Sequence, residues 1–75
     1  MQTYRNRGGT SPISAFETGP DTITVQFADG AAYVYNVRSA GQKHIAAMQR
    51  LAVDGQGLAT YITRHVRDRY ARRLG

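Results

Sequence analysis

Two alternating segments joined by a short, glycine-containing loop constrain the fold of this chain most strongly. From Thr22 to Phe27, apolar and polar side chains alternate, which is typical of a strand with one buried face. The segment Ala31 to Val37 alternates in the same way. Between them, Ala28-Asp29-Gly30 supplies a glycine that can adopt a positive φ. The sequence therefore predicts an antiparallel β-hairpin.

The length of the hairpin loop decides which side chains are buried. A two-residue loop would place Val34 beside Val25 and put both tyrosines of the second strand on the polar face. A three-residue loop with a glycine bulge instead pairs Tyr33 with Val25 and Tyr35 with Ile23. A one-residue slip moves every side chain to the other face. We predict the longer loop, because it gathers the large apolar residues on one face: Ile23, Val25, Phe27, Tyr33, Tyr35 and Val37.

Weaker patterns predict the remaining elements. A further strand is expected over Ile13 to Thr18, followed by a turn at Gly19-Pro20-Asp21. A first helix is expected to begin at Ser39, which has capping-box spacing to Gln42, and to end at Asp54-Gly55, with Gly55 as a left-handed cap.

A second helix is expected from about Gly57 to Arg73, with an apolar stripe in which a residue recurs every four positions: Leu58, Ile62, Val66 and Tyr70. The predicted fold is α+β, a three-stranded antiparallel β-meander followed by two α-helices packed on one face. Residues 1–12 lack periodicity and are expected to form a flexible N-terminal arm, and residues 13–74 a single domain. Either the third strand or Ile13 to Thr18 could form an exposed sheet edge.

Composition limits the classes of function that this chain can have. With 75 residues, 41% of them hydrophobic, there is room for one domain with a thin core. The chain has no cysteine, which excludes disulfides and thiolate metal sites. No stretch has the pattern of a signal peptide or a membrane span, so we expect a cytoplasmic protein without membrane attachment.

Catalytic and metal-binding patterns are weak. His44 and His65 lie on different predicted helices with few carboxylates near them, whereas zinc needs three or four ligands. The acidic residues fall mostly in turns and helix ends, and no serine has a base at a recognisable spacing. Gly55-Gln56-Gly57 follows a helix and is expected to be a helix–helix turn. We therefore expect no enzyme activity, no cofactor and no metal.

Positive charge is the sequence feature that says most about a possible function. Ten Lys and Arg against five Asp and Glu give a net charge of +5, which suits an anionic partner or is simply the charge of a soluble basic domain. Five arginines lie between Arg64 and Arg73, interleaved with tyrosine. Such arginines suit phosphate contact and base stacking, although they can also merely stabilise a helix end. The candidate nucleic-acid contacts are Arg64, Arg67, Arg72 and Arg73, with Arg5 and Arg7 from the arm.

The order of these features resembles the KTSC domain, a small domain found at the C-terminus of some lysyl-tRNA synthetases and as a free-standing bacterial protein. Tyr33-Val34-Tyr35 is similar to the Tyr-x-Tyr pattern of that family. Gly57, Tyr61-Ile62, Val66-Arg67 and Tyr70 are similar to its C-terminal pattern. The chain departs from the family at Val37-Arg38 and over 56–61. The resemblance implies an α+β fold and, by association with a synthetase, RNA binding.

Two functions are thus expected from the sequence. The first is a non-catalytic module that binds RNA or another nucleic acid through an arginine-rich C-terminal helix. The alternative is a protein-interaction or homo-oligomeric assembly module that uses an exposed sheet face or edge strand.

Overall fold

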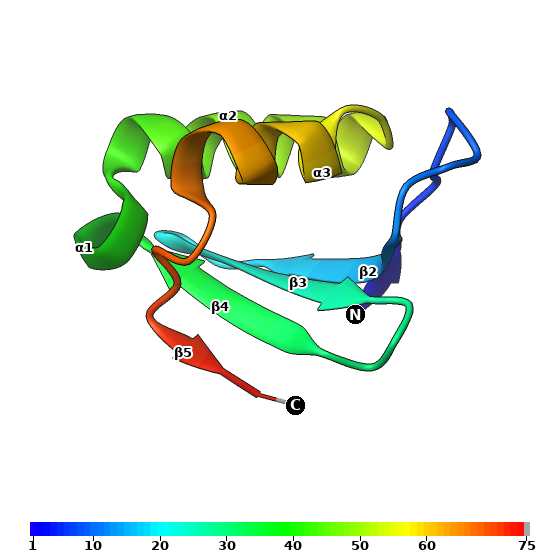
Figure 1. The fold of residues 1–75 in the computed structure, drawn as a ribbon. Helices are drawn as coiled ribbons and strands as arrows, with labels where there is room; N and C mark the ends of the chain where they lie inside the picture. Colours follow the sequence, from blue (N-terminus) through cyan, green and yellow to red (C-terminus); the bar gives the residue numbers. More distant parts are fainter. Residues whose placement is uncertain (75) are drawn as a thin grey trace.

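The structure, a computed structural model that describes residues 1–74, is a single antiparallel sheet with helices on one face (Figure 1). Five strands lie in the order β1-β2-β3-β4-β5. The strands are β1 (Gln2–Thr3), β2 (Ile13–Thr18), β3 (Thr22–Phe27), β4 (Ala32–Asn36) and β5 (Arg72–Arg73). The helices are α1 (Val37–Ala40), α2 (Gln42–Asp54), α3 (Leu58–Tyr61) and the π-helix η1 (Ile62–Val66). The predicted α+β class with an antiparallel sheet is confirmed, but the layout is not the predicted three strands and two helices.

The predicted register of the central hairpin is confirmed. Tyr33 pairs with Val25, and Tyr35 pairs with Ile23. The Phe27 N–H donates to the Ala31 carbonyl at 2.7 Å, which leaves the three predicted loop residues between the strands. Gly30 in this loop has a φ of +95°, a conformation that favours glycine. Burial of the apolar face has therefore fixed the register.

The core lies between this sheet face and the helices. Ile23, Val25 and Tyr35 of the hairpin are at most 2% exposed, as are Met48 of α2 and Leu58 of α3. The ribbon shows α2 and the α3–η1 helix side by side above the same sheet face (Figure 1). The side chains that alternate with the buried ones of β3, such as Thr24, are only partly buried on the other face.

The N-terminal segment differs from the expected flexible arm. Gln2 and Thr3 pair with Phe16 and Ala15 of β2. Tyr4 is only 3% exposed and belongs to the core cluster. A two-residue strand is too short to show a periodic pattern, which is why the sequence did not indicate it.

The predicted helix starts also need correction. Asn36 and Ser39 form the capping box, in which Ser39 N–H donates to Asn36 Oδ1 at 2.8 Å and Asn36 N–H to Ser39 Oγ at 3.1 Å. This box caps the short α1, and the chain breaks at Gly41, with a φ of +94°, before α2 begins. The predicted left-handed cap at Gly55 is confirmed by its φ of +79°.

The second helix is shorter than expected. It ends with η1 at Val66, and Arg72–Arg73 form the edge strand β5 beside β4. The prediction of an arginine-rich C-terminal helix over 57–73 is therefore wrong. Strands β2 and β4, which the sequence left as candidate sheet edges, both lie inside the sheet because β1 and β5 pair with them. The edges themselves are strands of two residues each.

Candidate nucleic-acid interface

An open groove lies where η1 ends above strands β3 and β4. Its volume is about 500 Å³, within the range of small-ligand sites. Four aromatic rings line it, together with one aliphatic, one basic and one acidic side chain: Phe27, Tyr33, Tyr35, Tyr70, Ile62, Arg67 and Asp68. Tyr33 is at the centre, with ring centroids 4.7 Å from Tyr70 and 5.8 Å from Phe27. These three rings are only partly buried, so the groove presents aromatic surface to solvent.

Arg67, in the wall of the groove, adopts an unusual backbone conformation. Its φ of 39° and ψ of −105° lie in a region that L-residues rarely adopt. Its N–H donates to the Ile62 carbonyl at 2.6 Å, the hydrogen bond that closes the π-turn. Its carbonyl accepts a 2.8 Å hydrogen bond from the Tyr35 hydroxyl. Strained residues and π-turns are both concentrated at functional sites, and here the two coincide.

Tyr35 is a buried residue whose hydroxyl stabilises this turn through its hydrogen bond to the Arg67 carbonyl. Burial, followed by the neighbouring Tyr33, Tyr70 and Asp68, raises the pKa of Tyr35 from 10.0 to about 12. The neutral phenol is therefore the form that the folded protein holds, and it is the form that can donate to Arg67.

Replacing Tyr35 with phenylalanine is expected to cost about 1 kcal/mol at neutral pH, because the Arg67 carbonyl loses its donor. The raised pKa gives the wild type a stability that is complete below pH 10 and is lost as the pH rises towards 12. Two pH units correspond to about 2–3 kcal/mol. Urea unfolding at pH 7, 10 and 11.5 should therefore show Tyr35→Phe becoming the more stable protein at the highest pH. Parallel pH profiles for the two proteins would contradict this account.

The structure brings only part of the predicted arginine set to the groove. Arg67 lines it, and the Arg73 guanidinium carbon lies 5.6 Å from the centroid of the Tyr33 ring, a cation–π contact. Arg73 pairs with Tyr33 in the sheet, so both side chains are on the groove face. Arg72 pairs with Val34, so its side chain lies on the opposite face of the sheet.

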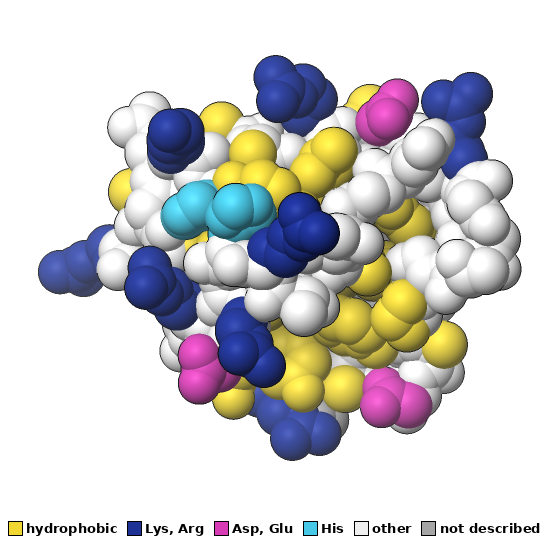
Figure 2. Space-filling view, turned by 45° about the horizontal axis from the view of Figure 1, so that its top comes forward, with side chains coloured by type: hydrophobic (Ala, Val, Ile, Leu, Met, Phe, Trp, Pro, Cys, Tyr) yellow, Lys and Arg dark blue, Asp and Glu magenta, His cyan; other side chains and the backbone are white. Residues whose placement is uncertain are grey.

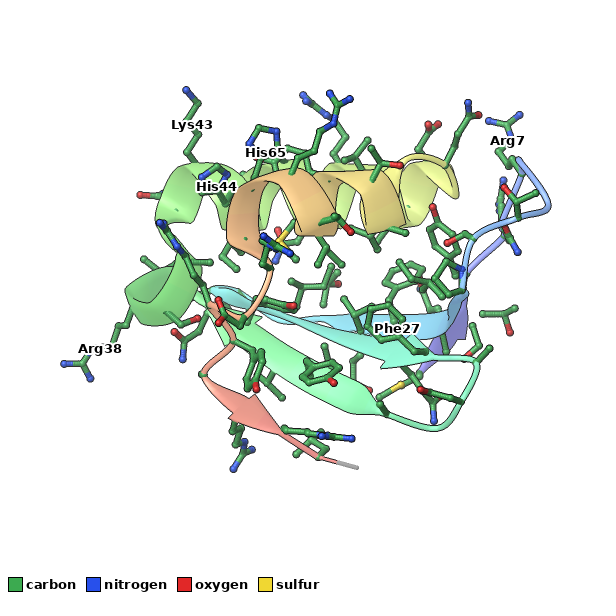
Figure 3. The ribbon with its side chains drawn as sticks, viewed as in Figure 1. Arg7, Phe27, Arg38, Lys43, His44 and His65 are labelled. Carbon is green, nitrogen blue, oxygen red and sulfur yellow. The ribbon has the colours of Figure 1, made fainter. Side chains whose placement is uncertain are left out.

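The other predicted arginines lie elsewhere. Arg64, on η1, lines a separate shallow hollow with Pro12, Ala59, Thr60 and Thr63. Arg7 forms an ion pair with Asp54, with 3.7 Å between Nη1 and Oδ1, and its N–H donates to the Gly55 carbonyl. Figure 3 shows Arg7 in the N-terminal loop, at the opposite end of the molecule from β5. Arg5 is in the same segment, so neither residue joins the groove.

The two tyrosines of the predicted family pattern have different roles. Tyr35 is 2% exposed and supports the η1 turn, whereas Tyr33 is partly buried in the groove. The sequence did not single out Phe27 or Tyr70 as site residues. The sequence pattern places Tyr70 in the apolar stripe of the expected second helix, and only the end of that helix at Val66 places it against Tyr33.

A second cluster of polar rings lies on the helical side. His44 Nδ1 is 2.6 Å from the Tyr61 hydroxyl, and the His44 and His65 rings stack with centroids 5.5 Å apart. Within residues 1–74, no three His, Cys, Asp or Glu side chains gather in a way that could hold a metal ion. Over the same residues, every helix is too short or too polar to cross a membrane.

No family model matches this sequence, and comparison with curated proteins and with solved structures finds no significant match either.

Proposed function

We propose that this protein is a small non-catalytic module that binds single-stranded nucleic acid, with RNA as the preferred ligand, in the aromatic groove. The observation that carries the proposal is the combination of partly exposed aromatic rings with guanidinium groups in and beside one groove. Tyr33 and Tyr70 offer stacking surface, and Arg67 and Arg73 lie at the same place. Bases stack on aromatic rings and on arginine planes, while guanidinium groups bind phosphate.

Single strands suit this groove better than duplex. The stacking surfaces are partly buried against the sheet, so only an unpaired base can reach them. The net charge of +5 adds attraction for any polyanion, which would be screened by salt. The resemblance of Tyr33 and Tyr35 to the KTSC pattern favours RNA among nucleic acids. Asp68 in the groove wall repels phosphate and can accept hydrogen bonds from base amino groups, which favours a base at that point.

The test is a fluorescence-anisotropy titration of labelled single-stranded RNA, tRNA and duplex DNA at low and near-physiological salt. We expect single-stranded RNA to bind most tightly and to remain bound at the higher salt. Tyr33→Leu should weaken binding by about 5–150-fold, because stacking contributes about 1–3 kcal/mol per base.

The matched control is Tyr33→Phe, which keeps the ring and should bind as the wild type does. Equal loss in both variants would show that the hydroxyl or the fold matters, not the ring. Weak binding of all nucleic acids that disappears at near-physiological salt would overturn the proposal, since it is the general behaviour of a basic protein.

A further inference from the structure

The cluster of His44, Tyr61 and His65 is a second candidate binding site, separate from the groove. Three elements contribute one ring each: His44 comes from α2, Tyr61 from α3 and His65 from η1. The Tyr61 ring lies 4.4 Å from that of His65 and 5.7 Å from that of His44. Figure 3 shows the two histidines together on the outer side of the helices, pointing away from the sheet.

The Tyr61 hydroxyl orients one of the imidazoles. It is 2.6 Å from His44 Nδ1, so this nitrogen is engaged and the ring is held in place. His44 and Tyr61 are partly buried, whereas His65 is exposed. The hydrogen bond at Nδ1 leaves Nε2 of His44 as the nitrogen available to a ligand. The cluster thus presents imidazole nitrogens of two histidines at the surface.

The charges around the cluster are predominantly positive. Lys43 precedes His44 on α2 and is labelled beside it in Figure 3, and Arg64 precedes His65 on η1. The other charged groups on the elements around the cluster are Arg38 of α1, Arg50 and Asp54 of α2, and Arg67, Asp68 and Arg69 after η1. Figure 2 shows the histidines among Lys and Arg side chains, with acidic side chains towards the edges of that face. Asp54 is at the far end of α2, in the ion pair with Arg7.

Two imidazolium charges on rings stacked with centroids 5.5 Å apart would repel each other. Histidine side chains in general change charge between pH 5 and 8. An oxyanion that accepts hydrogen bonds from both rings would remove that repulsion, so anion binding and protonation of the pair favour each other. Phosphate oxygens, which accept several hydrogen bonds at once, fit such a pair.

We infer that His44 and His65 form a phosphate-binding site for the backbone of the nucleic acid held in the groove, and that this site strengthens binding as the pH falls. The inference rests on the proposed function for the identity of the ligand. His65 is on η1 and Arg67 is two residues later, in the turn that follows. Their Cα atoms are therefore at most about 8 Å apart. A strand whose base occupies the groove can therefore place a neighbouring phosphate at the histidines.

The first experiment measures the affinity for labelled oligouridylate at pH 6.0 and 8.0 and constant ionic strength. The wild type should bind about tenfold more tightly at pH 6.0, as expected for one additional charge-assisted contact. His44→Gln/His65→Gln should lose the gain at pH 6.0, so that its affinities at the two pH values are equal. Tyr33→Leu should bind weakly at both pH values but keep the pH-dependent gain. A gain at pH 6.0 that persists in the double histidine variant would overturn the inference.

The second experiment needs no RNA. Inorganic phosphate is titrated into the protein at pH 6.0 while the imidazole proton signals of both histidines are followed by NMR. We expect saturable shifts of both residues, absent at pH 8.0 and absent with chloride at matched ionic strength. Failure of RNA to bind would overturn the proposed function alone, whereas unmoved imidazole signals would overturn the phosphate site itself.

Discussion

Replacing Tyr4 with alanine is expected to destabilise the protein by about 3–5 kcal/mol, the range measured for removal of a buried aromatic ring. Tyr4 is 3% exposed in the core cluster, although it lies in the segment that the sequence predicts to be a flexible arm. Its hydroxyl also accepts a 3.3 Å hydrogen bond from the Leu58 N–H at the start of α3. Small domains have only about 5–15 kcal/mol of stability, so this single substitution removes a large part of it.

Urea and thermal unfolding measure the effect directly. Tyr4→Ala should lower the Tm by about 12 °C or more, since each kcal/mol corresponds to about 4–8 °C in a domain of this size. Thr3→Ala is the matched control: Thr3 is an exposed neighbour on β1, and its loss should change stability by less than about 0.5 kcal/mol. A loss below about 1 kcal/mol for Tyr4→Ala would mean that the N-terminal segment is the loose arm that the sequence indicates.

The central hairpin could be predicted because many side chains agree on one register. Each of its apolar residues would move to the wrong face under a one-residue slip, so the free-energy difference between registers is large. The strand at Ile13 to Thr18 and the glycine cap at Gly55 rest on weaker local signals, and both are present. Periodicity and turn chemistry were sufficient for these elements.

The ends of the chain could not be predicted because tertiary contacts decide them. The apolar positions from Leu58 to Tyr70 fit a single helix, but that helix ends at Val66, where the Tyr35 hydroxyl bonds the Arg67 carbonyl. Tyr35 is 32 positions away in the sequence, so no local pattern reports this contact. Strands β1 and β5, with two residues each, depend in the same way on the neighbouring strand.

The candidate site was predicted only in part for the same reason. An arginine-rich helix would place Arg64, Arg67 and Arg72 along one surface, whereas the turn after Val66 and β5 distribute them over separate surfaces. The residue types were informative, since arginine and tyrosine do gather in the groove. The contact of Tyr70 with Tyr33 depends on where the helix ends, whereas Phe27 contacts Tyr33 within the hairpin.

Neutralising the two arginines at the groove should produce the largest effect on nucleic-acid binding. Arg67→Gln/Arg73→Gln is expected to weaken binding of single-stranded RNA by about 100-fold, as for two charge-assisted contacts of about 1.5 kcal/mol each. The slope of log affinity against log salt should fall in magnitude by about 1.4, because each phosphate contact on a single strand contributes about 0.7. Anisotropy titrations at four or more salt concentrations measure both quantities.

The control removes the same charge from the other end of the molecule. Arg5→Gln/Arg7→Gln also lowers the net charge by two, but Arg7 lies in the N-terminal loop, away from β5 (Figure 3), and the Arg5 side chain lies with it beside Gly55. If the groove is the site, this variant should lose affinity only slightly, through the long-range field of the protein. Equal losses in the two double variants would mean that RNA responds to net charge alone. A larger loss on the N-terminal side would place the contact surface at the arm and reject the groove.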